Sequence, residues 1–284
     1  MLSRSVILFL CLLAGYKASS GGDKDEQICR QKFSLAIAES LGSKPIGEVI
    51  AAVGRSFEGT PYAAHTLEQE GDERLVINLQ GLDCVTFVEN ALTLSRCIKK
   101  DSTSFASYAN ELQRTRYRGG VIDGYPSRLH YFSDWIHDNQ VKGIVQDVSQ
   151  KLGGEVYPKK IDFMTQHTDA YPRLRDAGIV QQIKSTESAI ATRTLYYVPK
   201  NRVQDVQSKI MNGDIIGITT TVEGLDISHT GIAVRVDGVL KFLHAPLSNG
   251  VVQITNESLA DYLVKIRKHT GIIIARPLEP DISH

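Results

Sequence analysis

Between positions 27 and 56, apolar residues recur at the three- and four-residue spacings of amphipathic helices, and the pattern breaks at Gly42 and Pro45. We therefore expect two helices there. After a turn signal at residues 59–62, Asp83 and Cys84 open a longer stretch whose apolar residues fall on nearly every helical face. A helix that is apolar all round is buried, so residues 84–100 are predicted to form a central helix with Asp83 as its N-cap. Further helices are predicted over residues 104–115 and 131–139.

The rest of the chain divides into an irregular zone and a strand-rich zone. Residues from about 141 to 207 carry scattered Gly and Pro without a repeat, and we interpret them as an insertion with a few short strands or helices. The last zone predicts a short helix at 259–264 and strands at 214–219, 229–236, 239–245, 251–254 and 271–275. Helices followed by an antiparallel meander indicate an α+β fold in which the sheet packs on the central helix.

The first twenty residues are predicted to be a signal peptide. Arg4 precedes an apolar run from Ser5 to Gly15, and small residues end the segment at Ser20. The alternative is a short N-terminal anchor. We expect residues 21–284 to form a single exported domain without stable membrane insertion.

The balance of acidic and basic residues excludes one class of protein. The chain has 284 residues with 32 Lys+Arg against 32 Asp+Glu, and removing residues 1–20 leaves 30 basic against 32 acidic residues. Nucleic-acid binding needs a basic surplus to neutralise phosphates, so we expect no nucleic-acid partner. An enzyme or a binding protein, expected to be a monomer, is favoured.

Three cysteines remain after residue 20: Cys29, Cys84 and Cys97. Cys84 and Cys97 share the predicted central helix, where thirteen residues separate them by roughly 20 Å, too far for a disulfide. Either Cys29 pairs with one of them, or all three are thiols. At a helix N-terminus, Cys84 has the backbone N–H groups and dipole that lower a thiol pKa. The alternative is that Cys84 is simply a small core residue.

Two histidines are brought together by the predicted hairpin. Asp237-Gly238 between β-branched residues indicates a two-residue turn, which pairs Val236 with Val239 and Gly231 with His244. His229 and His244 then lie on one sheet face as diagonal neighbours, roughly 5–8 Å apart. A nucleophilic Cys84 with a histidine base and a second orienting histidine is typical of a thiol hydrolase. The alternatives are a structural pair, or a zinc site completed by His130, His137 or His167.

Several motifs, in this order along the chain, resemble those of the NlpC-type papain-like peptidoglycan hydrolases. They are Gly59-Thr-Pro-Tyr62, Leu82-Asp-Cys84, Asn212-Gly213-Asp214, Ser228-His-Thr-Gly231 and Leu243-His-Ala245. Further stretches resemble one branch, the N-acetylmuramoyl-L-alanine amidase-like family. They are Asp83–Glu89, Ser127–Tyr131, Asp162–His167 with Tyr171, and Gly271–Arg276. Within the third stretch, Thr165 stands where we expect a serine. The resemblance covers roughly residues 45–277.

This resemblance implies a papain-like core in which Cys84 is the nucleophile, His229 the base and His244 the orienting residue. It implies no cofactor or metal, and a muropeptide or peptidoglycan substrate cleaved between N-acetylmuramic acid and L-alanine through a thioester. The residues expected to bind substrate are Tyr62, Asp83, Arg128, His130, His167, Tyr171 and Ser228. Two alternatives stay open: an endopeptidase that cuts the stem peptide between D-glutamate and the diamino acid, and a wall-fragment-binding protein without catalysis.

Overall fold

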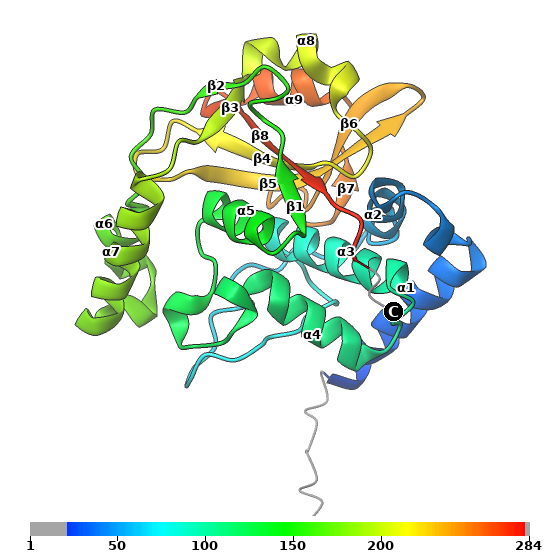
Figure 1. The fold of residues 1–284 in the computed structure, drawn as a ribbon, viewed down its shortest axis with the longest axis horizontal. Helices are drawn as coiled ribbons and strands as arrows, with labels where there is room; N and C mark the ends of the chain where they lie inside the picture. Colours follow the sequence, from blue (N-terminus) through cyan, green and yellow to red (C-terminus); the bar gives the residue numbers. More distant parts are fainter. Residues whose placement is uncertain (1–21, 282–284) are drawn as a thin grey trace, which may run out of the picture.

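The computed structural model describes residues 22–281, so the predicted signal peptide lies outside the described residues. The main helices occupy one side of the molecule and the sheet the other (Figure 1). Their bounds are α1 Gly22–Ala38, α2 Ile46–Arg55, α3 Cys84–Lys99, α4 Phe105–Arg116, α5 Phe132–Val141, α6 Phe163–Gln166, α7 Ala177–Ala191, α8 Val203–Val206 and α9 Leu259–Lys265. The predicted α1, α2, α3, α4, α5 and α9 are confirmed to within a few residues.

The strands form one antiparallel sheet in the order β2-β3-β8-β4-β5-β6-β7, with β1 also paired to β8. Their bounds are β1 Val145–Asp147, β2 Glu155–Val156, β3 Tyr196–Pro199, β4 Ile215–Thr220, β5 Ile227–Val236, β6 Val239–His244, β7 Gln253–Ile254 and β8 His269–Pro277. The predicted α+β class, an antiparallel sheet packed on the helix that begins at Cys84, is confirmed.

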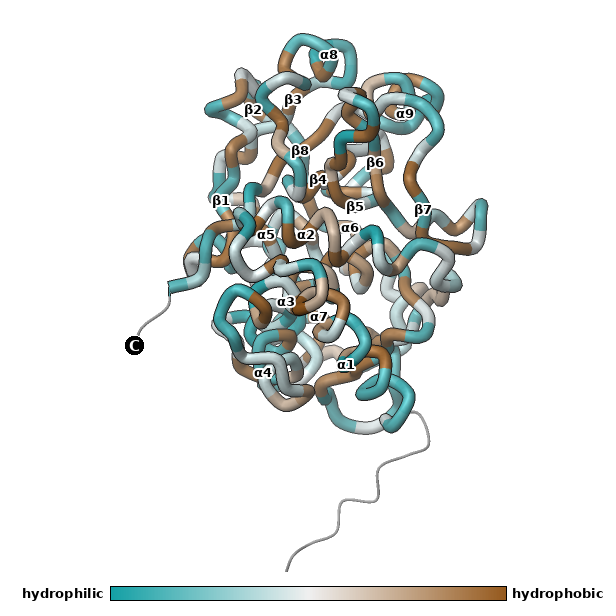
Figure 2. Tube along the Cα trace, turned by 90° about the vertical axis from the view of Figure 1, so that its right-hand side faces the viewer, coloured by the Kyte–Doolittle hydropathy of each residue, from teal (hydrophilic) through white to brown (hydrophobic). Residues whose placement is uncertain are grey.

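Both faces of the sheet are covered, which divides the apolar interior into two cores. One face, including Ile232 and Leu243, packs against α1 to α5. The other face, including Ala233 and Phe242, packs against α8 and α9. Figure 1 shows the sheet between these two groups of helices, and Figure 2 shows hydrophobic residues concentrated where they meet. The alternation of neighbours such as Ile232 and Ala233 between the two cores is the period-two pattern of a strand.

Helix α3 is held at its start by a capping box and along its length by burial. The Asp83 carboxylate accepts from the Thr86 N–H at 2.8 Å, and the Thr86 hydroxyl oxygen accepts from the Asp83 N–H at 2.9 Å. Two turns on, the buried Glu89 forms an ion pair with Arg116 of α4 at 2.7 Å. The first residue of α3 is therefore fixed by its own cap, and the helix is tied to its neighbours.

The zone from about 141 to 207 is more closely joined to the sheet than its irregular pattern suggests. Its strands β1 and β3 both pair with β8. By contrast, α6 and α7 pack on a small separate apolar cluster that includes Tyr131, Met164 and Ile183. The buried Glu187 of α7 accepts hydrogen bonds from the Tyr131 hydroxyl and from the Thr165 N–H and hydroxyl. Thr165 thus supplies the hydroxyl expected of a serine there.

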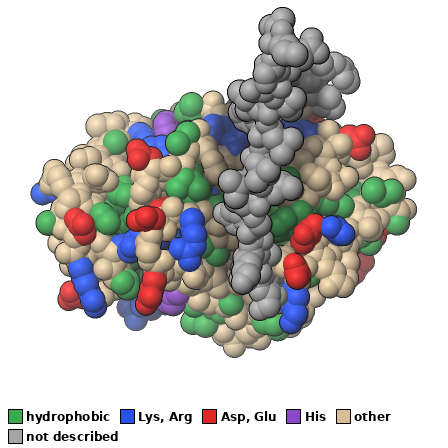
Figure 3. All heavy atoms as spheres, turned by 90° about the horizontal axis from the view of Figure 1, so that it is seen from below, with side chains coloured by type: hydrophobic (Ala, Val, Ile, Leu, Met, Phe, Trp, Pro, Cys, Tyr) green, Lys and Arg blue, Asp and Glu red, His purple; other side chains and the backbone are tan. Residues whose placement is uncertain are grey.

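The surface agrees with the balanced composition. Acidic and basic side chains are interspersed on the face seen from below, without a continuous patch of one sign (Figure 3). Within residues 22–281, no helix combines the length and the apolar character needed to cross a bilayer.

The turn before β4 passes so close to the start of α2 that only glycine fits, and this contact generates a stability prediction. Gly213 has φ +80°, and a Cβ there would lie 2.2 Å from the Gly47 carbonyl oxygen. Gly143 has φ +68° and nothing within 4 Å of its Cβ position. We expect Gly143→Ala to cost about 1 kcal/mol from the left-handed backbone alone and Gly213→Ala about 3 kcal/mol, because overpacking adds to it. Denaturant unfolding measures both, and equal losses would contradict the close approach.

Candidate active site

The β5–β6 hairpin has the predicted register, and it brings the two histidines into contact. Val236 pairs with Val239 and Gly231 with His244. His229 Nε2 and His244 Nδ1 lie 2.7 Å apart, within hydrogen-bond distance. His244 is buried, whereas His229 is partly exposed. The pair therefore has one member inside the protein and one at its surface.

The histidine pair packs against the Phe242 ring, which occupies the space left by the absent side chain of Gly231. A Cβ at Gly231 would lie 2.7 Å from the Phe242 ring and 2.6 Å from the Leu243 carbonyl oxygen. The absence of a side chain at Gly231 lets the Phe242 ring pack against both histidines, with centroid distances of 5.7 Å to His229 and 4.8 Å to His244. This packing restricts the orientation of both imidazoles.

Cys84 is the first residue of α3, and its thiol faces three backbone N–H groups. Those of Cys84 and Val85 belong to the helix start, and that of Thr230 follows His229 on β5. The contact with Thr230 places the thiol beside the strand that carries His229. The structure thus brings the three predicted catalytic residues to one place, where the N-terminus of α3 meets β5.

Burial, and not the helix terminus, dominates the pKa of Cys84. The three N–H groups lower the pKa of the thiol, but burial and the Asp83 carboxylate raise it to about 12. Burial also lowers the pKa of His229 to about 3 and that of His244 to about 4. The expectation of a lowered thiol pKa is therefore wrong. At neutral pH both the thiol and the two imidazoles are uncharged.

Tyr62 lies close to Cys84. Its segment is fixed by a bridge to Leu82 and by a 2.7 Å hydrogen bond from the Tyr62 N–H to the Gly250 carbonyl. Burial and the proximity of Cys84 and Asp83 raise the pKa of its hydroxyl, so the hydroxyl stays protonated and able to donate.

A cavity of about 180 Å³ adjoins the start of α3 and brings together three predicted substrate-binding residues, Asp83, Arg128 and His130. Arg128 is buried, donates to the Leu67 carbonyl at 2.8 Å and pairs with Glu68 at 2.6 Å. Its Nε has no hydrogen-bond partner among residues 22–281. His130 Nε2 lies 2.9 Å from the Tyr125 carbonyl, and burial lowers its pKa to about 3. The cavity also contains Glu89 and Arg116, which the sequence did not single out as site residues.

The other predicted substrate-binding residues lie outside the lining of this cavity. His167 is exposed, with Nδ1 2.9 Å from the Phe163 carbonyl, and Tyr171 packs on the α6–α7 cluster. Ser228 is exposed on β5 next to His229, and its hydroxyl donates weakly to the Ile218 carbonyl at 3.4 Å. The carboxylate of Asp83 is engaged in the cap of α3.

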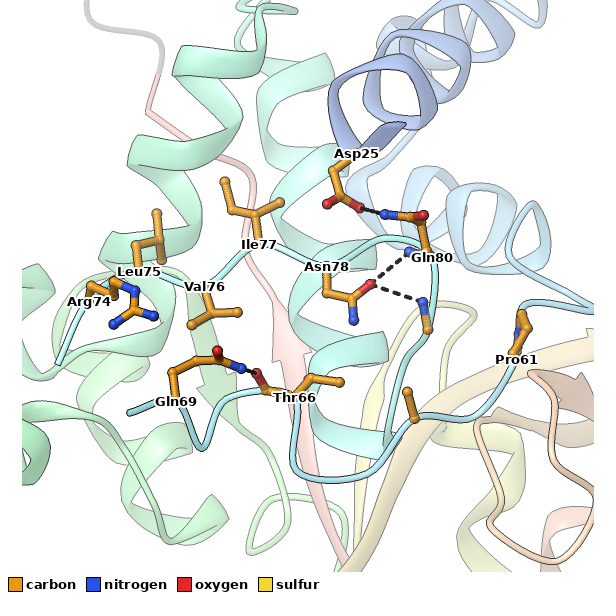
Figure 4. A pocket seen from close by; sticks show the side chains of 12 residues that line it. Asp25, Pro61, Thr66, Gln69, Arg74, Leu75, Val76, Ile77, Asn78 and Gln80 are labelled. Carbon is orange, nitrogen blue, oxygen red and sulfur yellow. Dashed lines mark hydrogen bonds between the residues drawn. The ribbon is translucent and has the colours of Figure 1, made fainter. Parts of the chain in front are cut away.

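A larger cavity of about 680 Å³ lies under the loop that precedes α3 (Figure 4). Figure 4 shows Asp25 accepting from the Gln80 side chain, and Asn78 Oδ1 accepting from the N–H groups of Gln80 and Gly81. These bonds shape the loop that leads into α3. Pro61 and Ala63, on either side of Tyr62, also line this cavity.

Cys29 and Cys97 are buried free thiols, so the three described cysteines form no disulfide. Among residues 22–281, no group of three or more His, Cys, Asp and Glu side chains is arranged to hold a metal ion. The sequence did not single out two aromatic residues near the histidine pair: Tyr262 of α9 packs against His244, and His269, the first residue of β8, packs against Tyr262. Only tertiary packing reveals them, because neither lies in a recognisable motif.

Comparison with known proteins identifies the family. Residues 52–273 match the family model AmiA-like, described as N-acetylmuramoyl-L-alanine amidase-like. An N-acetylmuramoyl-L-alanine amidase from Bacteroides uniformis ATCC 8492 is 36% identical over 82% of this chain and 98% of that chain, with a TM-score of 0.78. The chain therefore belongs to the N-acetylmuramoyl-L-alanine amidase-like family, and it is an amidase-like hydrolase.

Two further structures show how widely the fold is shared. A protein from Bacteroides fragilis, described as a candidate xylanase, is 39% identical over 78% of this chain and 98% of that chain, with a TM-score of 0.75. A Legionella pneumophila protein of the DUF1460 family covers 91% of this chain and 96% of its own at 23% identity, with a TM-score of 0.68, a likeness of fold alone. We found no match among curated proteins.

The uncharged resting site predicts how Cys84 reacts with an alkylating agent. Only the thiolate reacts, and a thiol whose pKa is about 12 forms more thiolate with each rise in pH. We expect alkylation of Cys84 by iodoacetamide to accelerate about tenfold per pH unit between pH 6 and 8. Peptide mass spectrometry measures the rate, with the buried Cys29 and Cys97 as internal controls. A rate that is constant from pH 5 to 8 would instead indicate a preformed thiolate–imidazolium pair.

Proposed function

We propose that the protein is a cysteine amidase that cleaves the bond between N-acetylmuramic acid and L-alanine in peptidoglycan fragments. The observation that carries the proposal is the meeting of the Cys84 thiol at the start of α3 with the strand bearing His229, whose Nε2 lies 2.7 Å from His244. A nucleophile, a base and a group that orients the base form the minimal set for acyl transfer through a covalent intermediate. The papain-like character of the core is part of this proposal.

The contact between the histidines supports one nitrogen of His229 as the proposed base. Because His229 Nε2 is engaged with His244, the nitrogen left to accept the thiol proton is Nδ1. A neutral His229 with Nδ1 unprotonated carries its proton on Nε2 and donates it to His244 Nδ1. Since thiol and imidazole are both uncharged at rest, proton transfer accompanies attack of the sulfur on the substrate carbonyl.

The start of α3 supplies the oxyanion stabilisation. The N–H groups of Cys84 and Val85 face the thiol and belong to the unpaired first turn of the helix, where donors are free to bind developing negative charge. The protonated Tyr62 hydroxyl lies close to Cys84 and is proposed as a further donor. These groups are fixed before substrate binds, so they need little rearrangement during the reaction.

The proposed reaction transfers the muramoyl acyl group in two steps, first to the Cys84 sulfur and then to water. Sulfur attacks the lactyl carbonyl of the muramic acid, and the thiol proton passes to His229. The C–N bond then breaks, the L-alanine amine leaves with the proton from His229, and a muramoyl thioester remains. Water, deprotonated by His229, attacks this thioester and restores the thiol. No step draws on a metal or cofactor.

The site favours amide over glycoside hydrolysis. Glycoside hydrolases typically use a pair of carboxylic acids, one on each side of the bond. Here the carboxylate beside the thiol, Asp83, is committed to the helix cap. The described xylanase character of the Bacteroides fragilis relative is therefore not carried over to this chain.

Export follows from the same assignment. Peptidoglycan lies outside the cytoplasmic membrane, and the first twenty residues have the composition of a signal peptide. We infer that residues 1–20 direct the chain across the membrane and that it works as a monomer in the periplasm or outside the cell.

A digest of purified muropeptides tests the assignment of bond and nucleophile. We expect mass spectrometry to find free sugar and an intact stem peptide with the wild-type protein, and no product above background with Cys84→Ser. The serine variant is nearly isosteric, so an unchanged circular dichroism spectrum and melting temperature would attribute the loss to chemistry. A chelator should leave the rate unchanged.

Three other results would each contradict one element of the proposal. A shortened muropeptide would identify the alternative endopeptidase. A wild-type protein that binds muropeptide without turnover would identify the non-catalytic binding protein. Full activity of Cys84→Ser would remove the thiol from the mechanism.

Arg128 generates a prediction about binding. Its buried guanidinium lines the cavity beside Asp83, and its Nε makes no hydrogen bond within residues 22–281 although it lies 3.6 Å from the Glu73 carboxylate. Arg128→Lys keeps the charge but loses the planar set of donors, so we expect KM to rise about tenfold with kcat changed less than about twofold. Glu68→Gln is the matched control, since it removes the shorter of the two Arg128 ion pairs and keeps the guanidinium. An unchanged KM in Arg128→Lys would assign Arg128 to holding the loop alone.

A further inference from the structure

The sheet face that carries the catalytic histidines is covered by α9, whose Tyr262 packs against His244. The two rings have a centroid distance of 5.2 Å and an interplanar angle of 77°. The Phe242 ring lies 4.8 Å from His244 and 5.6 Å from Tyr262. His244 is thus enclosed by one aromatic ring from its own strand and one from the helix.

Within this enclosure, one nitrogen of His244 lacks a conventional partner. Its Nδ1 faces His229, but its Nε2 is buried without a hydrogen-bond partner among residues 22–281. If Nδ1 accepts the proton of His229 Nε2, a neutral His244 must carry its own proton on Nε2. A buried N–H without an acceptor is destabilising, so its retention beside Cys84 calls for a compensating interaction.

The aromatic surroundings offer that interaction. The face of an aromatic ring carries partial negative charge, and it attracts both N–H groups and cations. The nearly perpendicular arrangement of His244 and Tyr262 is the edge-to-face geometry of such contacts. When His229 takes the thiol proton, positive charge develops on the hydrogen-bonded histidine pair, and a polarisable ring beside His244 stabilises this charge.

We propose that Tyr262 is a positioning residue of the active site: its ring holds His244 with Nδ1 toward His229 and stabilises the positive charge that the pair acquires during catalysis. Tyr262 acts through His244. The inference rests on the proposed function, because it assigns Tyr262 to the same nucleophile–base pair. It adds α9, an element without a motif of the family resemblance, to the catalytic apparatus.

Other ionisable groups also face this cluster and must be separated from Tyr262 in a test. Burial lowers the pKa of His244, and the Glu257 carboxylate, itself paired with Lys265 at 2.7 Å, partly opposes this effect. His269 lies on the other side of Tyr262, with a centroid distance of 5.8 Å, and its proximity lowers the pKa of His229. Lys200 lies close enough to lower the pKa of His269, and Cys84 raises that of Tyr262.

Two substitutions distinguish the ring from the hydroxyl. We expect Tyr262→Phe, which keeps the ring, to retain activity within about twofold, and Tyr262→Leu to lower kcat about tenfold with KM nearly unchanged. Loss of the ring destabilises the protonated pair, so the acid limb of the kcat/KM profile should move to lower pH in Tyr262→Leu. Glu257→Gln controls for the carboxylate: it should shift that limb while leaving kcat at neutral pH within about twofold.

A spectroscopic measurement tests the inference without substrate. In protein labelled with ¹⁵N at histidine, NMR reports which ring nitrogen of His229 and His244 carries the proton. We expect both histidines to be protonated on Nε2 in the wild type and in Tyr262→Phe. In Tyr262→Leu, the Nε2 proton of His244 should exchange with solvent at least about tenfold faster, because the ring that covers it is gone. Matching far-ultraviolet circular dichroism establishes that the variant folds.

The outcomes separate the two proposals. If the wild type does not hydrolyse muropeptide but the NMR result holds, the proposed function fails and the placement of His244 by Tyr262 stands. If Tyr262→Leu keeps the wild-type kcat, acid limb and exchange rate, the inference is overturned. If Tyr262→Phe is as impaired as Tyr262→Leu, the hydroxyl is the active group, and the inference is overturned as well.

Discussion

The site depends on one register, the pairing of β5 with β6. Because the Asp237-Gly238 turn sets Val236 opposite Val239, Gly231 falls opposite His244, and the two imidazoles meet at 2.7 Å. A shift by one residue would place the histidines on opposite faces of the sheet and exchange residues between the two cores. The register that buries the apolar residues is thus the same one that joins the two histidines of the proposed site.

Burial determines the charge state of Cys84 and of the two histidines. The surrounding protein restricts their contact with water, most completely for His244, which makes separated charges costly at rest. The N-terminus of α3 and the N–H of Thr230 oppose this effect without overcoming it. Their negative-charge stabilisation becomes most valuable when a substrate carbonyl brings a developing oxyanion into the site. The burial that keeps the Cys84 thiol protonated also strengthens the hydrogen bonds from these N–H groups to the oxyanion of the proposed reaction.

Much of this arrangement could be predicted from the sequence, because its signals are local. The apolar periodicity of α3, the Asp83 cap and the Asp-Gly turn each act over a few residues, and together they place Cys84, His229 and His244. The pairing of β1 and β3 with β8 was not predictable, since it joins residues more than seventy positions apart through short strands of weak pattern. The raised pKa of the Cys84 thiol was not predicted for a similar reason. The start of a helix can be predicted from the sequence, whereas the burial of a side chain depends on the whole fold. Tyr262 lies in no motif, and only tertiary packing brings it to His244.

The pairing of β1 with β8 also bears on how the protein is made. Val145 pairs with Pro277, and β8 separates β3 from β4 in the middle of the sheet. The sheet on which the histidines stand is therefore completed only when nearly the entire chain is present, a topology of high contact order that folds slowly. If the chain is exported as we propose, it cannot complete this sheet, and so cannot assemble the proposed site, until its last strand has crossed the membrane.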